Sequence, residues 1–357
     1  MPGPISTLVS KTQSAPAVVA FISIGVVQAT IMMVLQGIVV VQWQAFLKPT
    51  VLQVPRGYTV PTNFAIFLFG FLFQLLFMCD AIRLRNTAQA MLSCVLNAGF
   101  LPLAIFQRAD IKEAETSLRG SSDSNGDSLV YLDQDPWSII GNILFAMPII
   151  IGVFTLLLVI SVWYLKQFFS WQSYRNVGAD SKLRKMRLMY QIFAMFAKMA
   201  IYFIICFEII MGVTQHRAQG TEFIIHMVIL GVAVVIIGMS MIWAKSENRI
   251  GMIASISAYL AGLAYLVYML VTMHTSKKRF ASSVNTLAAF ASMAILFILL
   301  TTVFGIICLR NFWGGLKEHL GKHEEGWDNQ SRMRDVELET RTGFQYQNLE
   351  SKLDLDS

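Results

Sequence analysis

The chain has 357 residues, of which 55% are hydrophobic and only 14% are charged. In a typical soluble protein about 25% of all residues are charged, and they cover its surface. This composition therefore argues against a soluble protein, even one built only of helices. The formal net charge of +6 falls mostly in short segments between apolar blocks, which is typical of membrane topology and does not indicate nucleic-acid binding.

Eight apolar blocks divide the chain, and each has about 20 residues or more, enough to cross a hydrocarbon layer of roughly 30 Å as a helix. Only a helix satisfies the backbone of such a block within lipid. We therefore predict an all-α fold, a polytopic transmembrane helical bundle of about eight helices. Seven is the alternative count, because Asn97 and Pro102 interrupt the third block. The blocks are residues 17–41, 63–82, 88–107, 138–164, 190–213, 222–244, 250–273 and 286–309.

The segments outside the apolar blocks differ from one another in composition, and the predicted membrane domain spans residues 17–309. Residues 1–16 form a short N-terminal segment. Within the domain, loop 108–137 contains the acidic stretch GSSDSNGDSLVYLDQD, which predicts a flexible, solvated loop. Loop 165–189 is basic and contains SKLRKMR. The tail 310–357 is polar and poor in apolar residues, so we predict that it is disordered.

Lysine and arginine residues orient the predicted bundle. Fourteen of them lie in the loops on one side, which include the basic loop 165–189, and nine lie on the other side. The positive-inside rule places the richer side in the cytosol. Both termini are then cytosolic, and the acidic loop 108–137 is lumenal or extracellular. A seven-helix chain would instead have its termini on opposite sides.

Charged residues inside the blocks are candidates for function, because they are costly in lipid. Lys198 could extend to the cytosolic surface, pair with Asp80 near the same face, or contact a substrate or a lipid headgroup; the sequence favours the extension to the surface. Glu208 and His226 lie near the lumenal ends of their blocks and could form a pH-sensitive pair. A solvated pair without function is the alternative for these two residues.

Uncharged amide side chains also fall inside the blocks, and Gln74 and Asn97 are the candidates among them. Their expected role is to form interhelical hydrogen bonds, each worth about 1 kcal/mol or less. A path for a polar substrate is the alternative. The complete set is Gln28, Gln36, Gln74, Asn97, Gln107 and Asn142.

Motifs that would indicate catalysis are missing from the sequence. The five histidines form no HExxH pattern, no GxSxG or P-loop stands in a suitable context, and the four widely spaced cysteines do not fit a zinc site. We therefore predict no catalytic, cofactor or metal site, and a protein that is not an enzyme. One motif lies in the tail, where Tyr346 to Leu349 (YQNL) fits a sorting signal that a cytosolic trafficking adaptor would bind as an extended strand.

Three stretches resemble an uncharacterised fungal family of multi-pass Golgi apparatus membrane proteins. The first is GFLFQLLFMCDAIRLRNTAQ, residues 70–89, followed by Cys94, Asn97 and Gln107. The second is the fifth block, with Tyr190 and Lys198, and the third is RNFWGGLK, residues 310–317. The resemblance covers most of the membrane region but not the tail. It implies residence in the Golgi membrane and a fungal source, and it implies no activity.

We expect from these observations a non-catalytic integral protein of the Golgi membrane with a role in trafficking or membrane organisation. Its expected partners are the lipid bilayer and a trafficking adaptor, with no nucleic acid. The first alternative is a transporter of a small solute or lipid. The second is a seven-helix surface receptor, which would lie in the plasma membrane.

Overall fold

A computed structural model describes residues 4–48, 59–122, 127–131, 135–176, 181–215, 220–275 and 284–312. Eight helices in this part of the chain are long and apolar enough to cross a membrane. The predicted all-α bundle is therefore confirmed, and the described helices favour eight over the alternative of seven. The helices are α1 (Pro4–Phe46), α2 (Thr59–Arg83), α3 (Thr87–Arg119), α4 (Trp137–Asn176), α5 (Ser181–Gln215), α6 (Gly220–Lys245), α7 (Arg249–Thr275) and α9 (Val284–Arg310).

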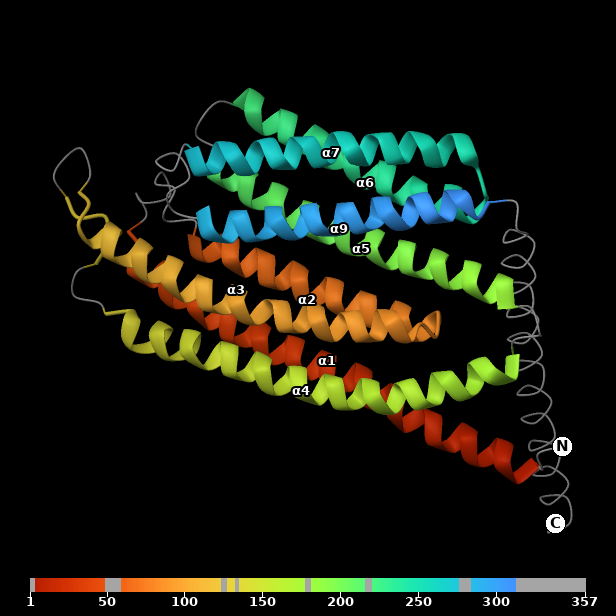
Figure 1. The fold of residues 1–357 in the computed structure, drawn as a ribbon. Coiled ribbons are helices and arrows are strands. Elements are labelled where there is room, and N and C mark those ends of the chain that lie inside the picture. The colour runs from red at the N-terminus through yellow and green to blue at the C-terminus, as the bar shows by residue number, and fades with distance from the viewer. Residues whose placement is uncertain are drawn as a thin grey trace, which may run out of the picture.

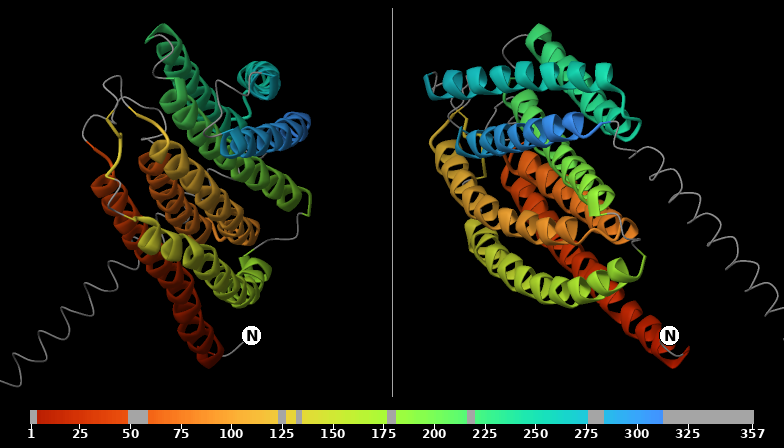
Figure 2. Two further views of the ribbon diagram at one scale, coloured as in Figure 1. Left: turned by 90° about the vertical axis from the view of Figure 1, so that its left-hand side faces the viewer. Right: turned by 45° about the vertical axis from the view of Figure 1, so that its right-hand side comes forward.

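The eight helices form two halves of four helices each (Figures 1 and 2). In the first half α1, α2, α3 and α4 pack in a ring, each helix on the next and α4 back on α1. In the second half α5, α6, α7 and α9 pack in the same order, with α9 back on α5. Each half can therefore bury its own core, although no repeat is evident in the sequence.

Two ends of the bundle are useful landmarks. The turn end holds the short α2–α3 and α6–α7 turns, and the loop end is the opposite one (Figure 1). Helix α1 begins and α9 finishes at the turn end, as expected for an even number of crossings. Which of the two ends faces the cytosol stays a prediction from the charge distribution.

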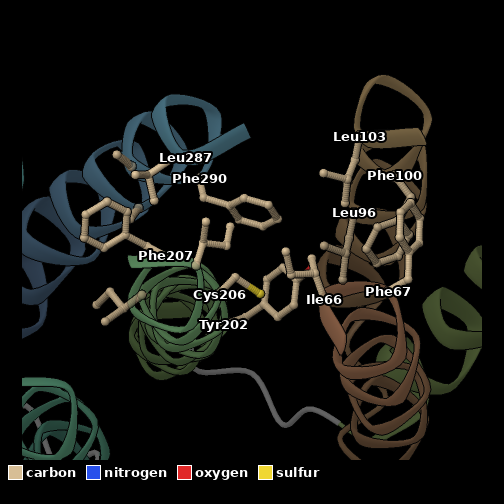
Figure 3. Close-up of a cluster of buried hydrophobic side chains, with 14 of the residues drawn as sticks. Ile66, Phe67, Leu96, Phe100, Leu103, Tyr202, Cys206, Phe207, Leu287 and Phe290 are labelled. Atoms are coloured by element: carbon tan, nitrogen blue, oxygen red, sulfur yellow. The ribbon is translucent and has the colours of Figure 1, made fainter. Parts of the chain in front are cut away.

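The two halves meet where α2 and α3 pack on α5 and α9. This contact is far less extensive than the packing within either half. Tyr202 of α5 is central to it, because its ring stacks on Phe73 of α2 with centroids 4.6 Å apart and an interplanar angle of 15°. Phe69, one turn earlier on α2, lies on the same ring at 5.7 Å. Figure 3 shows the apolar layer around Tyr202, with one group of side chains on α2 and α3 and another on α5 and α9. The groups are Ile66, Phe67, Leu96, Phe100 and Leu103, and Tyr202, Cys206, Phe207, Leu287 and Phe290.

Gly70 allows α2 to approach its neighbours closely at this layer. A Cβ atom at Gly70 would lie 2.7 Å from Cε1 of Phe100 and 3.0 Å from the Tyr202 hydroxyl oxygen. Small residues commonly permit such approaches between membrane helices. The absence of a side chain at Gly70 therefore helps to set the spacing of α2, α3 and α5.

Several helices extend beyond the apolar blocks that predicted them. Residues 108–119 of the predicted loop 108–137 belong to α3, in which Glu115 pairs with Lys112 and Arg119, both at 2.9 Å. Pairs spaced by three or four residues stabilise a helix outside the apolar layer. Most of the predicted loop 165–189 is helical as well, since α4 continues to Asn176 and α5 begins at Ser181. The predicted N-terminal segment 1–16 is also largely helical, because α1 begins at Pro4.

A short part of the acidic loop packs on the end of α1. The Tyr131 amide donates to the Phe46 carbonyl at 3.1 Å, and the Lys48 amide donates to the Leu129 carbonyl at 3.2 Å. Leu129 and Val130 are buried, so the prediction of a solvated loop is wrong for these two residues. The tail from Trp313 onward, including the predicted sorting signal at Tyr346 and Leu349, lies outside the described residues.

Candidate functional site

Asn97 of α3 connects all four helices of the first half. Its side-chain oxygen accepts from Gln28 of α1 at 2.8 Å and from Gln74 of α2 at 3.0 Å. Its amide nitrogen donates to the Thr155 hydroxyl of α4 at 2.8 Å. Gln28, Gln74 and Asn97 are all buried. We call these three amides and Thr155 the Asn97 cluster.

A second pair of amides joins α1 to α3 nearer the loop end. Gln36 and Gln107 donate to each other, with nitrogen–oxygen distances of 2.9 and 3.0 Å, and both side chains are buried. Asn142 is different, because its amide donates to the Ser138 carbonyl of its own helix and is exposed. Five of the six amides noted in the sequence thus bond to another helix.

The sharp turn between α2 and α3 positions Asp80. Arg85 adopts a positive φ of 51°, and the Asn86 side chain then accepts from the Ala88 and Gln89 amides to cap α3. Asparagine is one of the residues preferred at a helix N-cap. As a result Gln89, on the first turn of α3, donates to the Asp80 carboxylate at 2.6 Å and to the Phe77 carbonyl at 3.1 Å.

Lys198 of α5 reaches the same carboxylate oxygen from the second half. Its Nζ lies 2.5 Å from Oδ2 of Asp80, and both side chains are about one-third exposed or less. This ion pair links the two halves. The structure therefore shows the contact with Asp80, whereas the sequence favoured an extension of Lys198 to the surface.

Glu208, His226 and Tyr265 meet inside the second half, from α5, α6 and α7. Nδ1 of His226 lies 3.1 Å from Oε2 of Glu208 and 3.0 Å from the Tyr265 hydroxyl. The hydroxyl also donates to Oε1 of Glu208 at 3.4 Å. Glu208 and His226 are buried, so the pair is not solvated; its response to pH stays a prediction.

Sequence analysis missed one polar contact between the halves at the loop end. The Thr286 hydroxyl of α9 donates to Oδ2 of Asp110 of α3 at 2.8 Å. Asp110 was assigned to a loop because it follows the apolar block, and only the helical extension of α3 brings it against α9. Thr155 and Tyr265 were missed for another reason, because hydroxyl-bearing residues are common in these blocks and the sequence does not indicate which of them face a partner.

The clusters differ in what they can do chemically. The Asn97 cluster is neutral and can exchange hydrogen bonds with a polar molecule. The Asp80–Lys198 pair is charged, lies close to the turn end and bridges the halves. The Glu208–His226–Tyr265 cluster can hold a proton between a carboxylate and an imidazole. Within the described residues no group of three His, Cys, Asp or Glu residues is placed to hold a metal ion.

Comparison with known proteins gives one informative match. A UPF0658 Golgi apparatus membrane protein of Schizosaccharomyces pombe is 25% identical over 276 residues, which are 73% of this chain and 78% of that protein. This confirms the resemblance to fungal Golgi membrane proteins drawn from the sequence. No protein-family model matches the chain. No solved structure matches it either.

Proposed function

We propose that this chain is an integral membrane protein of the Golgi apparatus that acts without catalysis in trafficking or membrane organisation. The observation that carries the proposal is the similarity to a Golgi membrane protein of fission yeast over 276 residues. Since only residues 313–357 follow the last described residue, most of the matched residues lie in the helical region. The proposed location thus rests on the membrane helices.

The polar contacts within the bundle are consistent with a role in organising helices. Five buried amides and the Asp80–Lys198 pair join one helix to another. Such bonds in a membrane stabilise helix association and fix which helices are neighbours. They support a protein whose function depends on a defined arrangement of its helices.

A transporter is the second candidate, and the division into two halves favours it. The halves share a narrow interface with a polar contact near each end, Asp80–Lys198 and Asp110–Thr286, and aromatic rings between them. Many transporters move by rocking one such bundle against another. The surface receptor has less support, because a receptor of that kind has seven membrane helices and the described residues form eight.

A deletion strain distinguishes the two candidates by two measurements made together. One is the distribution of resident Golgi membrane proteins, and the other is the solute and lipid content of isolated Golgi vesicles. Dispersal of the residents with unchanged vesicle content supports organisation or trafficking. Altered content with normally placed residents supports transport and contradicts the first proposal.

We also propose that Tyr346 and Leu349 bind a cytosolic trafficking adaptor as an extended segment. Replacing both with alanine should shift a tagged copy away from its normal compartment. Replacing the nearby Phe344 with alanine is the matched control, because it removes an aromatic residue outside the motif. An unchanged location of the double variant would argue against the adaptor.

A further inference from the structure

Two buried oxygen atoms of the Asn97 cluster have no partner among the described residues. They are Oε1 of Gln28 and Oε1 of Gln74. The side chains of these residues are almost fully enclosed, since Gln28 is 0% exposed and Gln74 is 2% exposed. A buried amide oxygen without a donor is unfavourable, and here two occur on residues that share one acceptor, Asn97.

Rotating the amides does not remove the imbalance. If all three amides were turned over, Asn97 would donate to both glutamines and accept from Thr155. The atoms then left unpaired would be the two glutamine nitrogens in place of the oxygens. In either arrangement each glutamine keeps one polar atom that the described residues do not pair.

The chemistry of the cluster selects the molecule that can pair these atoms. No charged side chain bonds to Gln28, Gln74 or Asn97 in the described part of the chain. A divalent cation takes about six or more oxygen ligands, which two free amide oxygens do not supply. Water both donates and accepts, so it fits either orientation of the amides, and buried water typically bonds to two to four such groups.

The cluster lies deep in the predicted membrane. Asn97 is ten residues into α3, or about 15 Å at 1.5 Å per residue, which is half of a hydrocarbon layer of roughly 30 Å. Gln28 lies at a similar depth, twelve residues into the membrane span of α1 that begins at Pro16. Lipid at this depth supplies no donor or acceptor.

We propose that the Asn97 cluster is a water-binding site at the centre of the α1–α4 half. Water there pairs the free atoms of Gln28 and Gln74 and makes the middle of the half polar. This inference does not depend on the proposed function. The bound water distinguishes the Asn97 cluster from the layer around Tyr202, which consists of hydrophobic side chains.

Cysteine reactivity in the full chain in native membranes tests the site, because a thiol reacts as the thiolate, which forms in water and not in lipid. The four native cysteines are first replaced by alanine. Thr155→Cys then places a thiol in the cluster, and Leu156→Cys places one on the adjacent, 66% exposed, lipid-facing position. Both are treated with N-ethylmaleimide, which crosses membranes.

The expected result is that Thr155→Cys reacts about tenfold faster than Leu156→Cys or more, and that the difference disappears once the protein is unfolded in detergent. Equal slow rates in the membrane, with equal fast rates after unfolding, would show a dry cluster and overturn the proposal. If Thr155→Cys does not fold, a second pair leaves both glutamines in place and has the same two outcomes. It consists of Ile151→Cys, buried one turn before Thr155 on α4, and Val153→Cys, which is 51% exposed.

Discussion

At the scale of single residues, the interior of this protein pairs its polar groups across helices. Asp80 accepts from Lys198 and Gln89, and Glu208 meets His226 and Tyr265. A charged group inside a membrane is costly unless it is paired. Each pairing therefore fixes the rotation of two or three helices. Removing one partner should leave the other polar group inside the bundle without its hydrogen bond or ion pair.

Lys198→Met should lower the stability of the folded protein by about 1 kcal/mol, the upper range for a partly exposed ion pair. Lys198→Arg should lower it less, because the charge is kept. The melting temperature of the protein in detergent measures both effects. Arg83→Met is the control, since Arg83 is an exposed cation close to Asp80 in sequence. Equal losses for Lys198→Met and Arg83→Met would contradict a specific role for the pair.

Glu208→Ala should be more damaging than Glu208→Gln. The glutamine side chain keeps an acceptor oxygen for Tyr265 and presents a nitrogen that can donate to Nδ1 of His226. Alanine leaves two buried polar groups without their partner, at about 1–3 kcal/mol. Tyr265→Phe removes the hydroxyl contacts with both Glu208 and His226 and should cost about 1–2 kcal/mol. Thermal unfolding of the three variants in one detergent gives the order. Equal losses for alanine and glutamine would contradict a role for hydrogen bonding at Glu208, and unchanged melting temperatures in all three variants would show that the cluster does not contribute to stability.

At the scale of helices, glycine and chain turns set how closely α2, α3 and α5 approach. Gly70 lies where a Cβ atom would contact Phe100 and the Tyr202 hydroxyl. The positive φ of Arg85 and the Asn86 cap form the turn that brings Gln89 to Asp80. The ion pair between the halves thus depends on backbone features of α2 and its following turn.

Gly70→Ala should destabilise the protein by about 1–3 kcal/mol, because the added methyl group forces α2 away from α3 or α5. Gly99→Ala is the matched control on α3, since nothing lies within 4 Å of its added Cβ. That control should be neutral or slightly stabilising, as alanine has the higher helix propensity. Detergent melting curves compare the two. A loss in Gly99→Ala equal to that in Gly70→Ala would show that Gly70 has no special packing role.

The sequence predicted where helices lie better than where they end. All eight apolar blocks correspond to helices, because apolar length is a strong signal for a membrane span. Helix ends were missed where polar residues continue the helix, as with Glu115, Lys112 and Arg119 in α3. That error hid the contact of Asp110 with Thr286, because a residue assigned to a loop was not considered as a partner for α9.

The sequence identified which polar residues form the candidate site, but it did not identify the residues that they contact. Gln74, Asp80, Asn97, Lys198, Glu208 and His226 all form polar contacts with other helices. A sequence shows that a buried polar residue needs a partner, but it does not show how the helices are rotated about their axes. Thr155, Gln89 and Tyr265 became visible only when the packing of the helices was known.

At the scale of the whole molecule, eight crossings place both ends of the described chain on one side of the bundle (Figure 1). The excess of lysine and arginine predicts that this side is cytosolic. The opposite side then carries the α3–α4 segment with Leu129 and Val130 packed on α1.

Asp127→Thr tests this orientation, because it completes an N-glycosylation sequon at the native Asn125. A lumenal segment should be glycosylated, and the chain should migrate more slowly until the glycan is removed enzymatically. The native sequon at Asn329 in the tail is the internal control and should stay unmodified. A glycan at Asn329, with none at Asn125, would reverse the orientation.

Location in the cell tests the central claim most directly. A copy tagged at the C-terminus and expressed at its native level is imaged together with Golgi and plasma-membrane markers. Coincidence with the Golgi marker is the predicted result. A continuous plasma-membrane rim without Golgi signal would contradict the account and would favour uptake or reception at the cell surface.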